Sequence, residues 1–432
     1  MAERRTIQVD MLARVEGEGA LTLHYRGDTV EEVELRIFEP PRFFEAFLAG
    51  RRYTEAPDIT ARICGICPVA YQMSACQAME DALGVEIPHE LQQLRRMLYC
   101  GEWIESHTLH MVMLHAPDFL GFPDAMTMAR EHGQQVRDGL RVKKAGNRIV
   151  SLLGGREIHP VNVRVGGFYK LPSPKDLRAL AVELEACRGL AEGLVRWMAG
   201  FDFPALERDW PLVALAPSDG RYPFMAHPIG ISDGTRLAAR DWGAHFEEHH
   251  APYTNALHAR RRLDGRPYLC GPLARFALNF DALPAEHQRL ALDLGLAPPV
   301  RNPFKSLLVR GVEVVFALDE AAEIARRWAG AEAPAVPVTP RAGTGHGATE
   351  APRGLLYHRY VLDDEGLIVE ADIVPPTSQN QLAIEDDLRA LGPRLAALDD
   401  APATLLAEQA IRNYDPCISC ATHFLTLKRA QR

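Results

Sequence analysis

The chain has 432 residues, of which 47% are hydrophobic, 24% charged and 7% aromatic, and its formal net charge is −9 at pH 7. This composition is typical of a folded globular protein, and the moderate negative charge argues against a nucleic-acid-binding surface. Residues 1–10 lack the apolar core of a signal peptide, and no run approaches the roughly 18 apolar residues that a membrane span requires. We therefore predict a soluble, cytoplasmic protein.

The first third of the chain predicts a small sheet followed by helices. Apolar and polar residues alternate over 7–39, which predicts an antiparallel sheet with a turn at "RGD". Pro68 and Gly84 stand at the positions that favour the start and the end of a helix over 68–83. A long apolar stripe predicts a second, buried helix over 89–116.

Later segments continue this pattern. The sequence predicts helices over 175–200, 236–262 and 319–329 and strands over 311–316 and 367–374. The Pro-, Ala- and Gly-rich stretch 331–352 predicts a linker. The expected fold class is α-rich α+β, with a central bundle of long helices and small peripheral antiparallel sheets.

Four of the eight cysteines form two Cys-x-x-Cys pairs, Cys64 with Cys67 in "RICGICP" and Cys417 with Cys420 in "DPCISCATH". We expect each pair to place both sulfurs on one face, the first pair at the start of a helix, where the dipole favours thiolates. The spacing alone favours a structural zinc site, with a redox dithiol as the alternative. However, zinc ribbons usually have their pairs about 15–20 residues apart, whereas these pairs are roughly 350 positions apart.

Further motifs occur in order along nearly the whole chain. Together with the two cysteine pairs, the set resembles the large, catalytic subunit of nickel–iron hydrogenases. The motifs are "ARVEGEG" (13–19), "PRFFEAFLAGR" (41–51), "GGREIHPVNVRVGG" (154–167), "EAPRGLLYH" (350–358) and "VPPTSQNQ" (374–381).

The resemblance implies a nickel–iron centre held by the four thiolates. Cys64 and Cys417 would be terminal nickel ligands, and Cys67 and Cys420 would bridge nickel to iron. Carbon monoxide and cyanide would fill the remaining ligand positions of the iron. Soft thiolates suit such a centre. Cys417 would accept a proton as dihydrogen splits into hydride and proton.

The resemblance also implies roles for residues around the metals. Arg353 would lie over them and pair with Asp415, Thr377 would donate a hydrogen bond to a cyanide, and Pro376 would shape the apolar wall. Glu16 would pass the proton outward. The alternatives are a surface arginine at 353 and an exposed strand glutamate at 16.

A second metal site, usually magnesium, is implied by Glu45, the backbone carbonyl of Ile373, and His423. The sequence departs from the family at Tyr71, where many relatives have histidine, and at Ser106, where several have aspartate. These two departures are expected to alter the hydrogen bonds around the metals and to leave the reaction itself unchanged. No metal is assigned to three histidines that share the helix over 89–116: His107, His110 and His115.

The resemblance implies an iron–sulfur small subunit as partner, because no cluster-binding cysteine set remains in this chain. It further implies flavin and iron–sulfur subunits that couple to NAD(P), together with a maturation peptidase and nickel-insertion proteins. This chain itself has no GxGxxG unit for nicotinamide. The alternatives are an F420- or viologen-linked hydrogenase and a zinc-bound structural protein of the complex I-related fold.

The organisation that follows is a single large-subunit domain with five regions. They are an N-terminal sheet region (1–60), a helical core (61–330), the Pro/Gly-rich linker (331–352), a C-terminal metal-binding region (353–423) and a tail open to removal during maturation (424–432).

Overall fold

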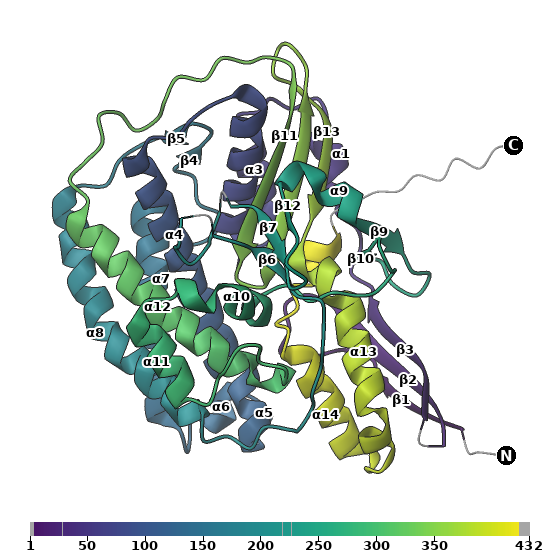
Figure 1. The fold of residues 1–432 in the computed structure, drawn as a ribbon. Coiled ribbons are helices and arrows are strands. Elements are labelled where there is room, and N and C mark those ends of the chain that lie inside the picture. Colours follow the sequence, from purple (N-terminus) through teal and green to yellow (C-terminus); the bar gives the residue numbers. More distant parts are fainter. Residues whose placement is uncertain (1–3, 28, 218, 226, 423–432) are drawn as a thin grey trace, which may run out of the picture.

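The computed structural model describes residues 4–27, 29–217, 219–225 and 227–422. A bundle of long helices forms one side of the molecule, and most of the small antiparallel sheets lie on the other side, together with the last two long helices of the chain (Figure 1). The predicted fold class is therefore confirmed. One continuous cluster of buried side chains extends from Ile7 to Cys420 and includes residues from the helices and from the sheets. His423 and the predicted tail, 424–432, lie outside the described residues.

Four long helices pack together as the bundle: α4 (His89–Thr108), α7 (Gly133–Gly154), α8 (Pro174–Met198) and α12 (Ser306–Arg327). The predicted helix over 175–200 corresponds to α8, which starts with Pro174 in its first turn after the N-cap Ser173. The predicted helix over 89–116 is α4, continued by the π-helical segment η2 (Leu109–His115) and α5 (Ala116–Leu120).

The helix predicted over 68–83 is α3 (Pro68–Leu83), and Gly84 ends it in the left-handed conformation, with φ of 65°. The remaining helical segments are shorter than α3, apart from one near the C-terminus. They are α1 (Phe44–Leu48), α2 (Ala56–Thr60), η1 (Ala61–Ile63), α6 (Ala125–Met128), η3 (Ala239–Asp241), α9 (Trp242–His245), α10 (Pro272–Asn279), η4 (Phe280–Ala282), α11 (Ala285–Asp293), η5 (Pro303–Lys305), α13 (Pro376–Ala396), α14 (Asp400–Arg412) and η6 (Ser419–Thr422).

The N-terminal sheet has the predicted antiparallel form, in the order β1 (Arg4–Val9), β2 (Gly19–Arg26), β3 (Thr29–Ile37). It lies beside α13 and α14, so that the first sheet of the chain and the last two long helices are neighbours (Figure 1). The other strands form small antiparallel sheets. They are β4 (Val163–Arg164) with β5 (Gly167–Phe168), β6 (Val213–Leu215) with β7 (Ile229–Ile231) and β8 (Arg236–Leu237), β9 (Phe246–His250) with β10 (Leu257–Arg261), and β11 (Gly343–Ala351) with β12 (Gly354–Leu362) and β13 (Ile368–Val374).

Two secondary-structure predictions are wrong. The segment 236–262 is a series of short elements ending in the β9–β10 hairpin, because Pro252 interrupts a helix and Glu247 pairs with Arg260 across the strands at 2.8 Å. The segment 311–316 lies inside α12, where burial on nearly every side overrides the strand preference of its β-branched residues. The strand predicted over 367–374 is β13.

The predicted linker over 331–352 is wrong in its second half, which is strand β11. Alternate glycines of β11 face helix α3: a Cβ added to Gly345 would lie 1.9 Å from the carbonyl oxygen of Ala78, and one added to Gly347 would lie 2.4 Å from that of Ser74. The glycines therefore allow the strand and helix backbones to touch. This contact brings the β11–β12 hairpin against the helix that follows Cys67.

No helix within the described ranges is both long and apolar enough to cross a bilayer.

Gly345→Ala is expected to destabilise the fold by about 1–3 kcal/mol, because the methyl group forces β11 away from α3. Urea unfolding of the purified protein measures the change. Gly189→Ala in α8 is the control: nothing lies within 4 Å of its added Cβ, so its stability should stay the same or rise by up to about 1 kcal/mol. Equal stability of the two variants would contradict the close packing described here.

Candidate metal centre

The two cysteine pairs lie in or next to helical segments. Cys64 follows η1 in an extended conformation, and Cys67 is the N-cap of α3. The prediction that both open the helix is therefore wrong for Cys64. Its sulfur instead accepts the backbone N–H groups of Ile66 at 3.2 Å and of Cys67 at 3.4 Å. Cys420 lies in η6, three residues beyond Cys417.

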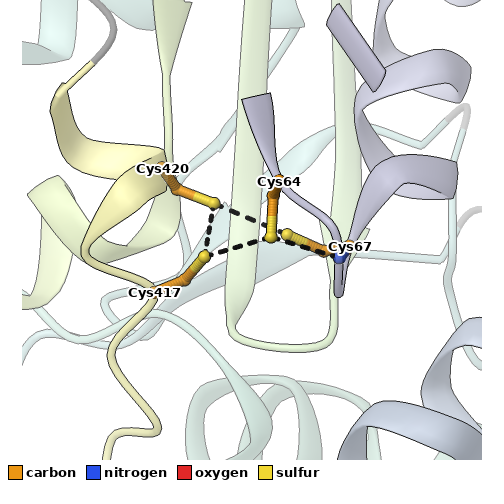
Figure 2. A group of neighbouring side chains, drawn as sticks. All are labelled: Cys64, Cys67, Cys417 and Cys420. Atoms are coloured by element: carbon orange, nitrogen blue, oxygen red, sulfur yellow. Dashed lines mark hydrogen bonds between the residues drawn. The ribbon is translucent and has the colours of Figure 1, made fainter. Parts of the chain in front are cut away.

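Folding brings the four sulfurs together (Figure 2). The Cys64 and Cys417 sulfurs are 3.3 Å apart, those of Cys67 and Cys420 are 3.5 Å apart, and those of Cys417 and Cys420 are 2.6 Å apart. All four lie within 4.8 Å of one another, are buried, and are free of disulfide bonds. This convergence across 353 residues is the geometry of a single metal centre.

Burial and mutual hydrogen bonding shift the pKa values of the thiols in opposite directions. Hydrogen bonding by Cys417 lowers the pKa of Cys64 well below its usual value, whereas burial raises the pKa of Cys417 well above it. Ionising all four thiols would place four negative charges within 4.8 Å, and the neighbouring Arg353 offers a single positive charge. A bound metal is therefore needed to hold the thiolates, and the sulfur donor set suits nickel, iron or zinc.

Glu16 lies against the C-terminal pair. The Cys417 thiol donates to its Oε2 at 3.1 Å, and the Ser419 N–H donates to the same oxygen at 3.0 Å. Residue 16 also forms a parallel bridge with residue 417. Burial raises the pKa of Glu16. The alternative of an exposed strand glutamate therefore does not describe this side chain.

Arg353 is buried, and its charge interacts with those of the sulfurs of Cys417, Cys67 and Cys64. Its Nε donates to the backbone oxygen of Asp415 at 2.6 Å, its Nη2 lies 3.0 Å from Asp415 Oδ2, and its Nη1 donates to Ser106 Oγ at 3.4 Å. Burial opposes the charge, but Asp415 and the nearby sulfurs raise the pKa of Arg353 well above its usual value. The guanidinium therefore stays charged beside the centre, and the surface-arginine alternative is wrong.

Three further residues predicted to lie near the metals are buried. The Thr377 hydroxyl, in the first turn of α13, accepts the Cys417 N–H at 3.0 Å, which leaves its own proton to donate. Pro376 begins that helix and is buried. The Tyr71 hydroxyl is buried, and burial, followed by the sulfurs of Cys420 and Cys67, raises its pKa well above the usual value.

Of the three residues predicted to bind the second metal, the structure describes two. Glu45 in α1 accepts the Ile373 N–H at 2.8 Å, so these two residues are brought together. His423 lies outside the described residues. The three histidines to which no metal was assigned have protein neighbours in the core: His107 with Glu313, His110 with the Arg412 carbonyl, and His115 with Asp118 and Asn413.

Sequence reasoning missed Glu102 of α4. Its carboxylate accepts the N–H of Val69 at 2.6 Å and that of Ala70 at 3.1 Å, so it caps the helix whose N-cap is Cys67. Burial raises the pKa of Glu102 well above its usual value. The sequence did contain a signal for this role: Glu102 lies within the apolar stripe of the predicted buried helix. A carboxylate that is buried there needs hydrogen-bond donors as partners.

The geometry agrees with comparisons to known proteins. The nickel-dependent hydrogenase family matches residues 42–139 and 317–423, two segments that contain one cysteine pair each. The alpha subunit of sulfhydrogenase 1 from Pyrococcus furiosus is 33% identical over 432 residues, covering 98% of both chains. This chain belongs to the nickel-dependent hydrogenase family. It is a catalytic large subunit, as its resemblance indicated.

Other relatives extend the comparison. The beta subunit of the NAD-reducing hydrogenase HoxS from Cupriavidus necator is 25% identical, covering 98% of this chain and 95% of that protein. A solved NAD+-reducing [NiFe]-hydrogenase in the H2-reduced state superposes with a TM-score of 0.89 at 25% identity, covering 98% of this chain and all of that one. The similarity thus spans the whole hydrogenase subunit.

Replacing Glu102 tests its support of Cys67. Glu102→Ala leaves two buried N–H groups unpaired, which costs about 1–3 kcal/mol for each group. We expect a lower melting temperature and less nickel per chain by elemental analysis, with partial recovery in Glu102→Gln, which keeps one acceptor oxygen. Native nickel content and stability in Glu102→Ala would show that the cap is dispensable.

Proposed function

We propose that this hydrogenase subunit holds one nickel and one iron on its four cysteines and catalyses the reversible cleavage of dihydrogen into protons and electrons. The observation that carries the proposal is the convergence of the four sulfurs within 4.8 Å in a member of this family. Cys64 and Cys417 are the proposed terminal nickel ligands, and Cys67 and Cys420 the proposed bridges. Carbon monoxide and cyanide are the proposed remaining ligands of the iron.

When bound, the nickel–iron group supplies the electron-accepting part of heterolytic cleavage. The protein supplies the base for the proton. Cys417 Sγ receives the proton in this proposal, and Glu16 Oε2, 3.1 Å away, takes it onward. Because burial raises the pKa of Glu16, its carboxylate binds a proton more readily than an exposed one.

Arg353, Asp415, Pro376 and Thr377 form the proposed polar and apolar wall of the active site. Arg353 keeps a fixed charge beside the sulfurs, and Asp415 orients its planar guanidinium through contacts at 2.6 and 3.0 Å. A planar fork that is held in this way can donate to a ligand of the iron or polarise dihydrogen. The free hydroxyl proton of Thr377 can donate to a cyanide, while Pro376 excludes water.

The second site is proposed to bind magnesium through Glu45, the Ile373 carbonyl and His423. Carboxylate and carbonyl oxygens are the donors that a hard cation prefers. The contact of Glu45 with Ile373 supports this assignment because it places an oxygen ligand beside that stretch of β13.

Electrons are proposed to leave through an iron–sulfur small subunit. Within the described residues, the four cysteines outside the centre are buried and scattered: Cys76, Cys100, Cys187 and Cys270. The loop of the first pair reaches the surface at Gly65, beside Ile158, whose side chain is 58% exposed. An exposed apolar residue at this point fits a partner surface close to the metals.

NAD(P) is the proposed final acceptor, through further flavin and iron–sulfur subunits, in a cytoplasmic complex that depends on nickel insertion and a maturation peptidase. Similarity to the NAD-reducing enzyme over 98% of this chain supports this choice. An F420- or viologen-linked complex is the alternative. A zinc-bound structural protein is disfavoured by the family match.

Metal analysis of the purified native complex tests the centre. We expect about one nickel per large subunit, iron in excess of that bound by the iron–sulfur subunits, and infrared bands from carbonyl and cyanide ligands. A Cys417→Ser variant purified in parallel should lose nickel. One zinc per chain and no such bands would refute the nickel–iron assignment.

Replacing Glu16 tests the proton route. Glu16→Gln keeps the shape and one acceptor oxygen but removes the basic carboxylate, so dihydrogen/proton exchange with deuterated water should fall at least about 100-fold. Metal content should be unchanged. Mass spectrometry of the evolved isotopologues measures the exchange. Native exchange in this variant would place the proton route elsewhere.

A further inference from the structure

The side chain of Arg353, whose charge interacts with the sulfurs, extends from a tight turn. Strand β11 ends at Ala351 and pairs there with Gly354, the first residue of β12, so Pro352 and Arg353 are the two residues of the turn. A hairpin tip of this kind moves readily unless other groups hold it. The position of the Arg353 guanidinium therefore depends on what holds the turn.

Arg275, in α10, holds this turn from behind. Its Nη1 donates to the Ala351 carbonyl at 2.7 Å, and its Nη2 donates to the Pro352 carbonyl at 3.0 Å. On another side, Gly271 brings the α10 backbone close: a Cβ added there would lie 2.6 Å from the Arg353 carbonyl. The turn is thus held between the backbone at Gly271 on one side and the Arg275 guanidinium on the other.

Every N–H of the Arg275 guanidinium has a partner. Besides the two carbonyls, Nε and Nη2 donate to the two oxygens of Glu313 at 3.0 and 2.9 Å, and Nη1 donates to Glu350 at 3.0 Å. The side chains of all three residues are fully buried. Because the fork is rigid and planar, these contacts leave it a single orientation.

The partners of Arg275 are themselves fixed. The indole ring of Trp103 lies 4.2 Å from the guanidinium carbon. Glu313 accepts the Tyr222 hydroxyl at 2.8 Å and contacts His107 Nε2 at 3.0 Å. His107 directly follows Ser106, which accepts from Arg353, so the same network supports the guanidinium from two directions.

We propose that Arg275, clamped by Glu313, is a positioning residue for Arg353. It acts by holding the carbonyls of the β11–β12 turn, which sets where the Arg353 guanidinium lies relative to the four sulfurs. The inference rests on the role proposed for Arg353 and adds to it the element that determines its position.

A matched pair elsewhere separates positioning from fold stability. Arg95 pairs with both oxygens of Glu80 at 2.8 and 2.7 Å and donates to the Arg164 carbonyl at 3.2 Å. The pair is also buried, but Glu80 lies near the C-terminal end of α3, whereas Cys67 precedes its first residue. Arg95→Lys therefore disturbs a comparable ion pair without touching the turn.

The test is a double-mutant cycle in the holoenzyme complex, with dihydrogen turnover, nickel and iron content, and melting temperature measured for Arg275→Lys, Arg353→Lys, the double variant and Arg95→Lys. Arg353→Lys should keep its metals and lose at least about 100-fold in kcat, because an ammonium cannot replace the planar fork. Arg275→Lys should lose about 10- to 100-fold in kcat with metals retained, since a misplacement near 1 Å costs about that much.

In the double variant, the kcat should be no lower than in Arg353→Lys alone, because Arg275 acts through Arg353. Arg95→Lys should lower the melting temperature and keep native kcat. If Arg275→Lys does not fold, Glu313→Gln replaces it, since that change weakens the clamp and keeps its shape.

Three results would overturn the proposal: native kcat in Arg275→Lys or its replacement, a multiplicative loss in the double variant, or an equal kcat loss in Arg95→Lys. Native kcat in Arg353→Lys would instead remove the role proposed for Arg353, and this inference with it. The two failures are therefore distinguishable.

Discussion

The structure depends on one electrostatic constraint: four ionisable sulfurs share a buried space less than 5 Å across. Thiolates at this distance repel one another strongly when water is excluded. Among the described residues, the surrounding protein offers backbone N–H groups to Cys64 and the guanidinium of Arg353. The remaining charge is neutralised either by protons that stay on the sulfurs, as the raised pKa of Cys417 favours, or by a bound metal that replaces them, so metal binding and the stability of the folded chain are linked.

Each cysteine pair is held by groups that come from distant parts of the chain. Glu102 caps the helix that begins at Cys67, and Thr377 accepts the N–H of Cys417. Glu16 binds the C-terminal pair through the Ser419 N–H. Strand β11, with its glycines against α3, leads into the turn that carries Arg353, whose charge interacts with the sulfurs. The helical bundle provides the rigid support that keeps these contacts in register.

Much of this could be predicted from the sequence, because local signals were strong. The cysteine spacing and the helix α3 between Pro68 and Gly84 are examples. Other elements depend on tertiary contacts that leave no local pattern. Burial between α4 and α8 makes a helix of the β-branched run 311–316, and pairing between β9 and β10 makes strands within 236–262. Arg275 escaped notice for the same reason, since its partners are far away in the sequence.

The separation of the two cysteine pairs has a consequence for biosynthesis. Cys417 follows Cys64 by 353 residues, so at about 5–20 residues per second the ribosome needs roughly 20 to 70 s to add it. During that interval the first pair exists as a lone dithiol, and the long loop must close before the remaining ligands arrive. The catalytic centre is therefore among the last parts of the molecule to take shape.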